Sequence, residues 1–432
     1  MATTLTSNYV NRLASGFLKA WNSQMVFSKT VNRSVITDND FRNPASGDTA
    51  FVRRPWDFTA VETARGDLTS STMNTLQRGR ASAVAQNVIT VPIQWDLIDE
   101  SQDLNDEDLG MIMSAASSRL ATKFETNLAA YAKNNLGHTL GTVTNTVSQW
   151  SDVAQIGSFA SAMGFPEGRC TGLFDPYSIE RLANAQNGLA GNSGTLVTSA
   201  WERAAIAGNF GNVDARMCDT LAAHTTGAGY DNATVVIDGV APTQTYLSAK
   251  DTYQTTLALT GFANGDTLLI GDRLSIPSIY FVNQKTKTLS VGRDGAPLPY
   301  QCVVTATPTA ADANGDMTVV VQGPAIFEAN GQYDTISAAI GTSNGVSIIS
   351  GAESTVNVPS IFMHPEALGL AFVRLSKLYG QESRVITSKD GSFSMRLSMG
   401  SDMTTAETTL RIDMQPVFST FNPLLGGVVW GN

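Results

Sequence analysis

Large apolar side chains recur at every fourth position near the start of the chain. The series consists of Tyr9, Leu13, Phe17, Trp21 and Met25. With a polar residue ahead of it to cap the first turn, this spacing predicts an amphipathic helix within residues 1–37. The wide apolar face of such an arm must be buried. The pattern leaves open whether it packs on its own domain or docks on a neighbouring chain.

Between residues 47 and 92 the periodicity changes to that of strands with a polar middle. Residues 49–53 and 85–93 predict the two legs of a long hairpin. The stretch between them contains hardly any core-forming run. A segment of this length without a core of its own is either functional or disordered.

A long helix is predicted from Asn105 to Asn135. Its first turn is acidic, which suits the positive end of the helix dipole. Apolar positions from Leu109 to Tyr131 keep a spacing of three and four residues, and Gly137 can end the helix. A coiled coil is the alternative. Because the stripe lacks heptad charges at its flanks, a helix lying across a sheet fits better.

Short strand-like runs separated by Asn-Gly and Asp-Gly pairs fill the region from about residue 223 to 348. The runs are 234–237, 267–270, 280–282, 302–304, 318–321 and 346–349. Such pairs favour tight hairpin turns, since both central positions tolerate positive φ. Strands at this spacing predict a small closed barrel or sandwich. Mixed α/β segments flank the region, so it is predicted to be an insertion; a helix over 365–378 and a hairpin at Asp390-Gly391 follow.

Composition narrows the class of protein. The chain has 432 residues, only 15% of them charged, and a net charge of -10. This length predicts two or three domains, and the acidic balance argues against tight phosphate binding. Three widely spaced cysteines give no disulfide framework or CxxC pair, which indicates a reducing compartment. Neither a secretion signal nor a membrane-spanning run is predicted.

Three motifs that suggest chemistry are weak. Residues 341–345 fit the G-x-S-x-G nucleophile pattern around Ser343, but a strand-like run follows where a helix is required. Residues 312–316 resemble the start of a calcium loop that lacks its later ligands. The three histidines, at 138, 224 and 364, have no metal-binding spacing. We therefore expect no catalytic residues, no metal and no cofactor.

Charged residues in the middle of the predicted hairpin are better candidates for function. They are Arg53, Arg54, Asp57, Glu62, Arg65, Asp67, Arg78 and Arg80. The two signs are interspersed, which favours reciprocal salt bridges across subunits over a nucleic-acid contact. A plain solvated loop remains the alternative for any single residue.

The N-terminal arm has the opposite charge to the rest of the chain. Residues 1–37 contain four basic residues and no Asp or Glu. This asymmetry predicts contact with a negatively charged partner, with Arg12, Lys19 and Trp21 as candidates. The alternative is that the basic residues only keep an amphipathic helix soluble.

The end of the chain combines a polar-flanked strand (410–414), a Pro-bounded loop and a short apolar terminus. Upstream, Leu173-Phe-Asp-Pro-Tyr177 reads as a strand-to-helix corner. With the long hairpin and helix, this order of segments resembles the major capsid (coat) proteins of tailed bacteriophages. The resemblance is to the branch of short-tailed enterobacterial phages that carries an inserted β-barrel domain, and it covers nearly the whole chain.

The resemblance implies an α+β phage shell fold. Its parts would be an N-terminal arm (1–46), an extended loop (47–94) that reaches over the adjacent subunit, a spine-helix or peripheral domain (95–150), the first part of an axial domain (151–222), an inserted Greek-key barrel (223–348) and an axial and peripheral return (349–432). Lysine-to-asparagine cross-links join subunits in one branch of these shells, but residues 48–92 contain no lysine.

The implied function is non-catalytic self-assembly into hexamers and pentamers of an icosahedral shell. The implied partners are other copies of the chain, a scaffolding protein, a portal protein and packaged double-stranded DNA bound without sequence specificity, with no membrane. The protein would be assembled in the host cytoplasm and reside in the virion. Two other classes remain open: a carbohydrate-binding or adhesive β protein centred on residues 223–348, and an esterase built on Ser343.

Overall fold

The structure is a computed structural model. It describes residues 21, 25–33, 47, 49–63, 65–69, 71, 73–96, 106–189, 208–230, 233–239, 241–329, 331–378, 382–387, 393–402 and 407–432. The chain divides into two compact units, each built from segments distant in the sequence. Unit 1 comprises Met1–Val52, Ser82–Ala129 and Leu368–Ser419, and unit 2 comprises Arg53–Ala81, Ala130–Ala367 and Thr420–Asn432.

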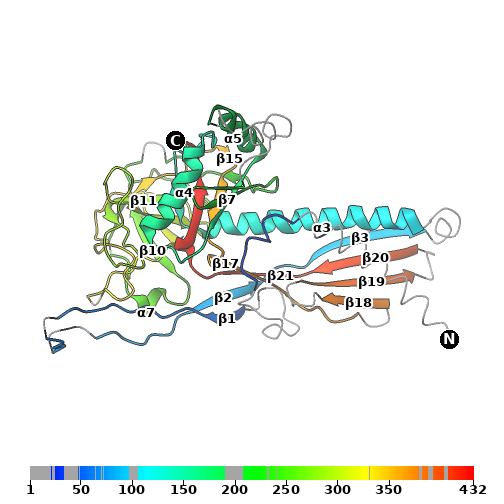
Figure 1. The fold of residues 1–432 in the computed structure, drawn as a ribbon, viewed down its shortest axis with the longest axis horizontal. Helices are drawn as coiled ribbons and strands as arrows, with labels where there is room; N and C mark the ends of the chain where they lie inside the picture. The colour runs from blue at the N-terminus through cyan, green and yellow to red at the C-terminus, as the bar shows by residue number, and fades with distance from the viewer. Residues whose placement is uncertain are drawn as a thin grey trace. The chain divides into compact units, whose positions relative to one another are not determined.

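The predicted long helix is present as α3, Asp106–Asn135. In unit 1 it runs along an antiparallel sheet of order β18-β19-β20-β3 (Figure 1). The strands are β3 Ile89–Asp96, β18 Glu382–Thr387, β19 Ser394–Asp402 and β20 Glu407–Met414. Leu397 and Ile412 lie opposite each other and are buried, as is Phe124 of α3. The prediction of a helix lying across a sheet is confirmed.

The predicted hairpin is wrong in its second leg. β1 (Thr49–Arg53) pairs with β2 (Arg80–Ala85), in a sheet of order β1-β2-β21-β17, whereas β3 pairs with β20 in the other sheet. β2 buries only alanines on its inner face, so its strand signal is weak. β3 has a strong alternation but ends the order of its sheet, where Pro92 is tolerated.

The predicted helix over 365–378 is also wrong. Residues Leu368–Phe372 form β17, which pairs with β21 (Pro416–Thr420). Every residue of β17 is buried. A short apolar run buried on both faces has no strand periodicity, so the sequence alone cannot separate it from a buried helix.

The main sheet of unit 2 has the order β4-β22-β16-β5-β7-β6. Its strands are β4 His138–Leu140, β5 Cys170–Phe174, β6 Asn209–Phe210, β7 Val213–Met217, β16 Ser360–Met363 and β22 Gly426–Val429. β22 is the apolar end of the chain and pairs parallel to β4. The predicted corner is confirmed, because α5 (Pro176–Leu189) follows β5 directly. The second helix beside this sheet is α4, Trp150–Met163.

The predicted β region forms a second sheet of unit 2, of order β14-β11-β12-β13-β10-β9. Its strands are β9 Val236–Ile237, β10 Gln254–Thr260, β11 Arg273–Tyr280, β12 Pro299–Val304, β13 Met317–Gln322 and β14 Ser347–Ile348. Backbone hydrogen bonds from Val346 to Val235 (2.8 Å) and from Ile237 to Asn344 (3.0 Å) join the two ends of this order. An autonomous inserted barrel stays a prediction.

The individual strands of this region were predicted unevenly. Residues 267–270 are not a strand, and only Thr267 makes an isolated bridge, with Ala228. β10 and most of β11 lie outside the predicted runs. The remaining small elements of unit 2 are α7 Tyr246–Ala249, η2 Pro423–Leu425, β8 His224–Thr225 and β15 Val356–Asn357. Among the described residues, no helix combines the length and apolar character needed to cross a membrane.

Candidate assembly surfaces

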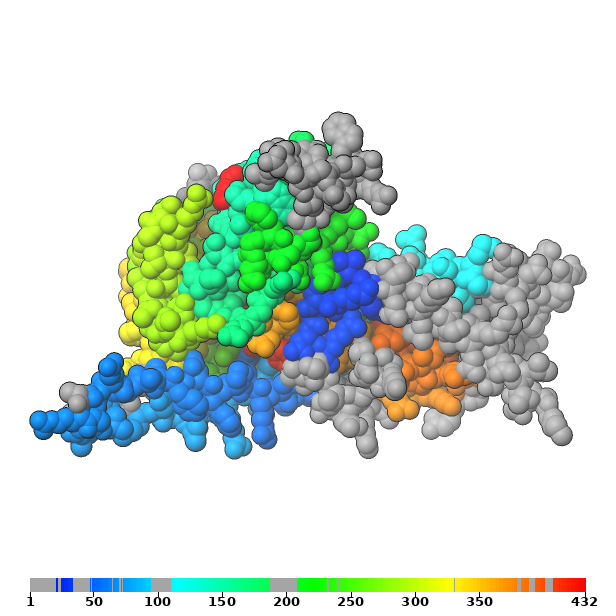
Figure 2. Space-filling view, viewed as in Figure 1, coloured from blue at the N-terminus to red at the C-terminus, as the bar shows by residue number. Residues whose placement is uncertain are grey.

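The segment between β1 and β2, residues 53–81, is here called the extended loop. It carries a concentration of exposed large apolar side chains, each 43–75% accessible: Trp56, Phe58, Val61, Leu68, Met73 and Leu76. Single exposed apolar residues need no explanation, but a group of this size on one segment indicates an interaction surface. Figures 1 and 2 show this segment, in blue, with its tip standing clear of the yellow-green strands of unit 2.

Arg54 attaches the base of the loop to the turn between α7 and β10. Its guanidinium carbon lies 3.6 Å from the ring centroid of Tyr253, and its Nε donates to the Lys250 carbonyl at 3.1 Å. The side chain is 7% exposed, and this burial lowers the pKa of Arg54. On the returning arm, the Gly79 carbonyl accepts from the Arg54 N–H at 3.0 Å. A Cβ on Gly79 would lie 2.6 Å from the Tyr246 hydroxyl, so only glycine fits there.

Farther from the base than Arg54, Gln332 joins the outgoing and returning halves of the extended loop. Its Nε2 donates to the carbonyls of Asp57 (2.7 Å) and Thr75 (3.1 Å), and its Oε1 accepts from the Thr75 N–H (2.9 Å). Gln332 is fully buried. Lys287 adds an ion pair of 2.5 Å to the Asp57 carboxylate. At Asp57 and Thr75 both halves of the loop are therefore attached to the rest of unit 2.

The support beneath these contacts is aromatic. Tyr246 of α7 and Tyr333 stack with ring centroids 3.7 Å apart and planes 7° apart. They form a buried cluster with Ala249 and Ile326, against which Tyr253 packs. Burial raises the pKa of Tyr253, so its ring stays neutral and presents its face to Arg54.

Beyond Gln332 the described residues of the loop make polar contacts with one another. Asn74 accepts from the Thr59 N–H (3.1 Å) and donates to the Thr59 carbonyl (2.8 Å). Near the tip, Asp67 accepts from the N–H and hydroxyl of Thr69, and these bonds lower the pKa of Asp67. The tip thus has local order but no core of its own.

The predicted contact residues of the loop fall into two groups. Three are engaged within the chain: Arg54 as above, Asp57 with Lys287, and Arg80 with Asp251 at 3.7 Å. The other five are exposed: Arg53, Glu62, Arg65, Asp67 and Arg78. Sequence reasoning missed Gln332, since nothing in the sequence marks an isolated glutamine more than 250 residues from its partners.

The described part of the N-terminal arm packs on its own chain. Trp21 is 1% exposed and lies against Phe124 (5.9 Å between ring centroids) and Phe393 (5.1 Å). The buried carboxylate of Glu125 in α3 accepts the backbone N–H groups of Val26, Phe27 and Ser28 at 3.3, 2.6 and 3.1 Å.

Residues 21 and 25–33 of the arm therefore pack on their own unit. Trp21 is therefore buried within its own subunit. Arg12 and Lys19 lie outside the described residues.

The motifs that suggested chemistry have structural explanations. Ser343 has a positive φ of 68° in a turn, its N–H donates to Ile237, and β14 follows instead of a helix. Asp312 accepts from the N–H groups of Asn314 and Asp316 within a turn. No group of three metal-binding side chains occurs among the described residues.

The histidines make unrelated contacts. His138 is buried with its Nε2 2.9 Å from the Leu424 carbonyl, and burial lowers the pKa of His138 to about 3. His224 lies 2.9 Å from Asp272. Burial also lowers the pKa of His364.

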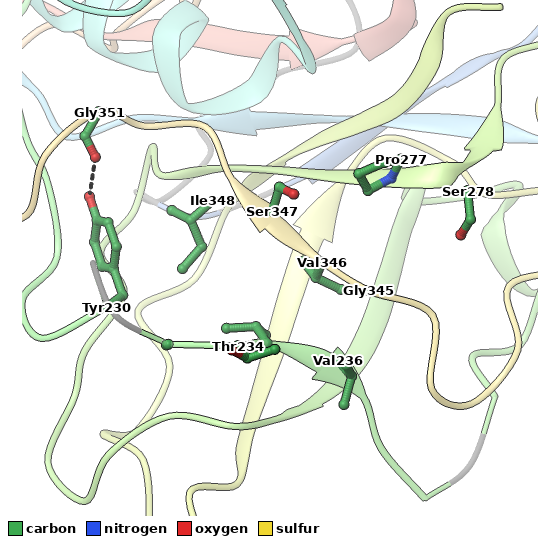
Figure 3. A pocket seen from close by; sticks show the side chains of 12 residues that line it. Tyr230, Thr234, Val236, Pro277, Ser278, Gly345, Val346, Ser347, Ile348 and Gly351 are labelled. Atoms are coloured by element: carbon green, nitrogen blue, oxygen red, sulfur yellow. Dashed lines mark hydrogen bonds between the residues drawn. The ribbon is translucent and has the colours of Figure 1, made fainter.

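A cavity of about 520 Å³ opens on the second sheet of unit 2, between β9, β11 and the segment before β14 (Figure 3). Its lining is small or aliphatic, and its polar side chains are hydroxyls such as Thr234, Ser278 and Ser347. Tyr230, the aromatic residue in the lining, is buried and donates to the Gly351 carbonyl at 3.3 Å. Among the described residues of the lining there is no acid or base for catalysis and no exposed ring on which a sugar could stack.

Comparison with known proteins supplies a context for these surfaces. A family model described as "P22 coat protein - gene protein 5" matches residues 1–431. The "Major capsid protein" of Acyrthosiphon pisum secondary endosymbiont phage 1 is 35% identical over 435 residues, covering 100% of both chains.

Solved structures are more distantly similar. One titled "Mycobacterium phage Che8" has 10% identity and a TM-score of 0.43 over 93% of this chain and 90% of its own. "Capsid structure of the Cyanophage P-SCSP1u" has 11% identity and a TM-score of 0.42 over 94% and 88%.

Proposed function

The chain belongs to the P22 coat protein family, and from this premise we propose how it builds a capsid. The protein is a phage major capsid protein, a structural component of the virion shell. We propose that it self-assembles into hexamers and pentamers, and that these close an icosahedral shell around double-stranded DNA. The observation that carries the proposal is the 35% identity to a major capsid protein over the full length of both chains.

The extended loop is the proposed contact with the adjacent subunit. Six exposed apolar side chains on a segment anchored by Arg54 and Gln332 are pre-positioned for burial against another copy. Anchoring lowers the ordering entropy that association must overcome. The exposed charges Arg53, Glu62, Arg65, Asp67 and Arg78 are proposed to set the register of that contact, since rim charges affect specificity more than affinity.

The remaining partners are proposals by analogy with the family. We propose that assembly takes place in the host cytoplasm on a scaffolding protein, with a portal protein in the shell. DNA would be enclosed without sequence specificity, which accords with the net charge of -10. Each contact is weak, and closure of the shell multiplies them. We propose no catalytic activity, metal or cofactor, and no observation favours a carbohydrate-binding function.

Assembly of the purified chain tests the proposal. Sedimentation velocity and negative-stain microscopy should show capsomers or shells at high protein concentration. Replacing Met73 and Leu76 together by Asp should leave slowly sedimenting subunits with unchanged thermal unfolding. The matched control, Met73→Leu with Leu76→Met, keeps the apolar surface and should assemble. A wild-type chain that stays monomeric with scaffold present would contradict the proposed function.

A further inference from the structure

Three basic residues of unit 1 line a groove of about 620 Å³. They are Arg374, Lys377 and Arg384, here called the basic groove, and they come from β18 and the segment that precedes it. Arg374 and Lys377 are exposed, and Arg384 is half-buried. The groove is therefore an accessible positive site on a chain whose net charge is -10.

The cations of the basic groove are not neutralised within the described part of the chain. None of their three side chains makes a hydrogen bond or an ion pair there. Glu382 is the one acid among the described lining residues, and it is exposed and forms no ion pair with them. The sequence Tyr-Gly-Gln at 379–381, between the two halves of the lining, carries no charge. Three cations gathered in one hollow raise the local positive potential, which attracts an anionic partner.

The residues beneath the groove add to its positive charge. Arg396 donates from Nη1 to the Ser376 carbonyl at 2.9 Å, so its guanidinium lies against the segment that lines the groove. Its Nε and Nη2 donate to Asp413 at 3.0 and 2.6 Å. Arg411 donates to the other oxygen of this buried carboxylate at 2.6 Å. Two arginines share one carboxylate, which leaves a net positive charge beneath the groove.

The positive charge continues from the groove across the sheet. Ser383 of the groove is opposite Ser398 on β19, which is in turn opposite Arg411 on β20. Neighbouring strands lie ~4.8 Å apart, so Arg411 is roughly 10 Å from Ser383 on the same face of the sheet. The Arg411 side chain is 46% exposed. A DNA duplex carries one negative charge per about 1.7 Å of its axis, so a cationic surface of this width meets several phosphates at once.

We propose that the basic groove binds the phosphate backbone of duplex DNA. The inference rests on the proposed function, because it names the surface through which the shell protein meets the enclosed DNA. Arginine and lysine attract phosphate, and the hydroxyls of Ser376 and Ser383 in the lining are donors of the kind that bind phosphate oxygens. Such contacts do not read bases, so the binding is weak and independent of sequence. Duplex DNA is favoured as occupant because its regular charge lets every subunit make the same contact; another copy of the chain is the competing occupant.

Salt-dependent binding of a short fluorescent DNA duplex to unassembled subunits tests the inference, with anisotropy as the readout. The groove variant carries Arg374→Gln, Lys377→Gln and Arg384→Gln. Its affinity should fall about tenfold at ~50 mM salt. The slope of log K against log salt should also become shallower by roughly 2–3, since each cation that meets a phosphate contributes about 0.9.

The matched control removes the same three charges from exposed sites away from the groove. It carries Lys123→Gln, Lys285→Gln and Arg293→Gln. The control should bind the duplex with the affinity and the salt slope of the wild type. Particle assembly is measured on the same proteins, and the groove variant should assemble like the wild type, because the groove contacts DNA and not another copy.

The two assays separate the outcomes. A groove variant that binds the duplex as tightly as the control overturns the inference, and so do wild-type subunits that assemble but bind no duplex at low salt. A groove variant that keeps duplex binding but loses assembly assigns the groove to another copy and also overturns it. If the triple variant fails to fold, Lys377→Gln alone should make the slope shallower by roughly 1, and an unchanged slope overturns the inference. In each of these cases the proposed function stands, whereas a wild-type chain that forms no particles contradicts that function and leaves the duplex measurement to decide the groove.

Discussion

Replacing Glu125 by Gln should detach the N-terminal arm from α3. The carboxylate accepts three backbone N–H groups, two at Oε2 and one at Oε1. A glutamine of the same shape offers one acceptor oxygen and turns an NH₂ group towards the remaining donors. At least one charge-assisted hydrogen bond is lost, and a buried N–H is left without an acceptor.

The magnitude follows from the values of such bonds. A hydrogen bond to a charged group contributes about 1.5–3 kcal/mol, and a buried donor left unsatisfied costs ~1–3 kcal/mol; the two figures overlap, because both count the same lost bond. We expect a loss of roughly 2–4 kcal/mol in the free energy that holds residues 25–33 in place. Native-state hydrogen exchange of the Phe27 and Ser28 amides should then accelerate by about 30- to 1000-fold.

Hydrogen exchange monitored by mass spectrometry or NMR on the unassembled subunit measures this effect. Glu180→Gln is the matched control, because Glu180 is exposed on α5. The control should leave exchange in the arm unchanged. If Glu125→Gln also leaves the Phe27 and Ser28 amides protected as in the wild type, the carboxylate does not anchor the arm and the reasoning fails.

Three further predictions concern the loop base, pH and covalent chemistry. Arg54→Ala should destabilise the loop base by roughly 1–3 kcal/mol through loss of the cation–π contact and a hydrogen bond; Arg53→Ala is the control, and equal exchange of the Gly79 region in both variants would argue against this role. Burial lowers the pKa of His138 from 6.5 to about 3. Between these two pH values the unfolded chain therefore binds more protons than the folded chain. The contribution of His138 to the free energy of unfolding should therefore fall by about 1.4 kcal/mol per pH unit as the pH drops below 6.5. The variant His138→Gln should reduce this slope, which urea titrations at several pH values measure. Since residues 48–92 contain no lysine, boiled particles should run as one band near 45.8 kDa, and a ladder of larger bands would refute this.

The long-period patterns were the part of the fold that sequence predicted well. The apolar spacing from Leu109 to Tyr131 correctly predicted α3, because a helix of 30 residues repeats this spacing over many turns. The strand-like runs between Asn-Gly and Asp-Gly pairs located β9, β12, β13 and β14 but missed β10 and most of β11. Short buried elements were not predictable: β2 buries only alanines, and β17 has no polar face to mark its period.

The contacts that build the candidate surfaces were mostly beyond the sequence. Composition and charge spacing marked the extended loop, yet they could not separate Arg54, which is buried in its own chain, from Arg53, which is exposed. Glu125 and Gln332 each bind backbone groups about 100 or more residues away. A single polar residue with a distant backbone partner has no local pattern, so only the tertiary structure reveals it.

Oxidative footprinting of Met73 tests most directly whether the extended loop becomes an interface in the shell. In the isolated subunit Met73 is 61% exposed, so its thioether should be oxidised readily. Hydroxyl-radical labelling of unassembled subunits and of purified particles, read by mass spectrometry, compares the two states of the same chain. Oxidation of Met73 should fall several-fold in particles, while Met217, also exposed in the subunit, reports the behaviour of a site outside the loop. An unchanged rate at Met73 in intact particles would contradict the claim that this loop joins the subunits.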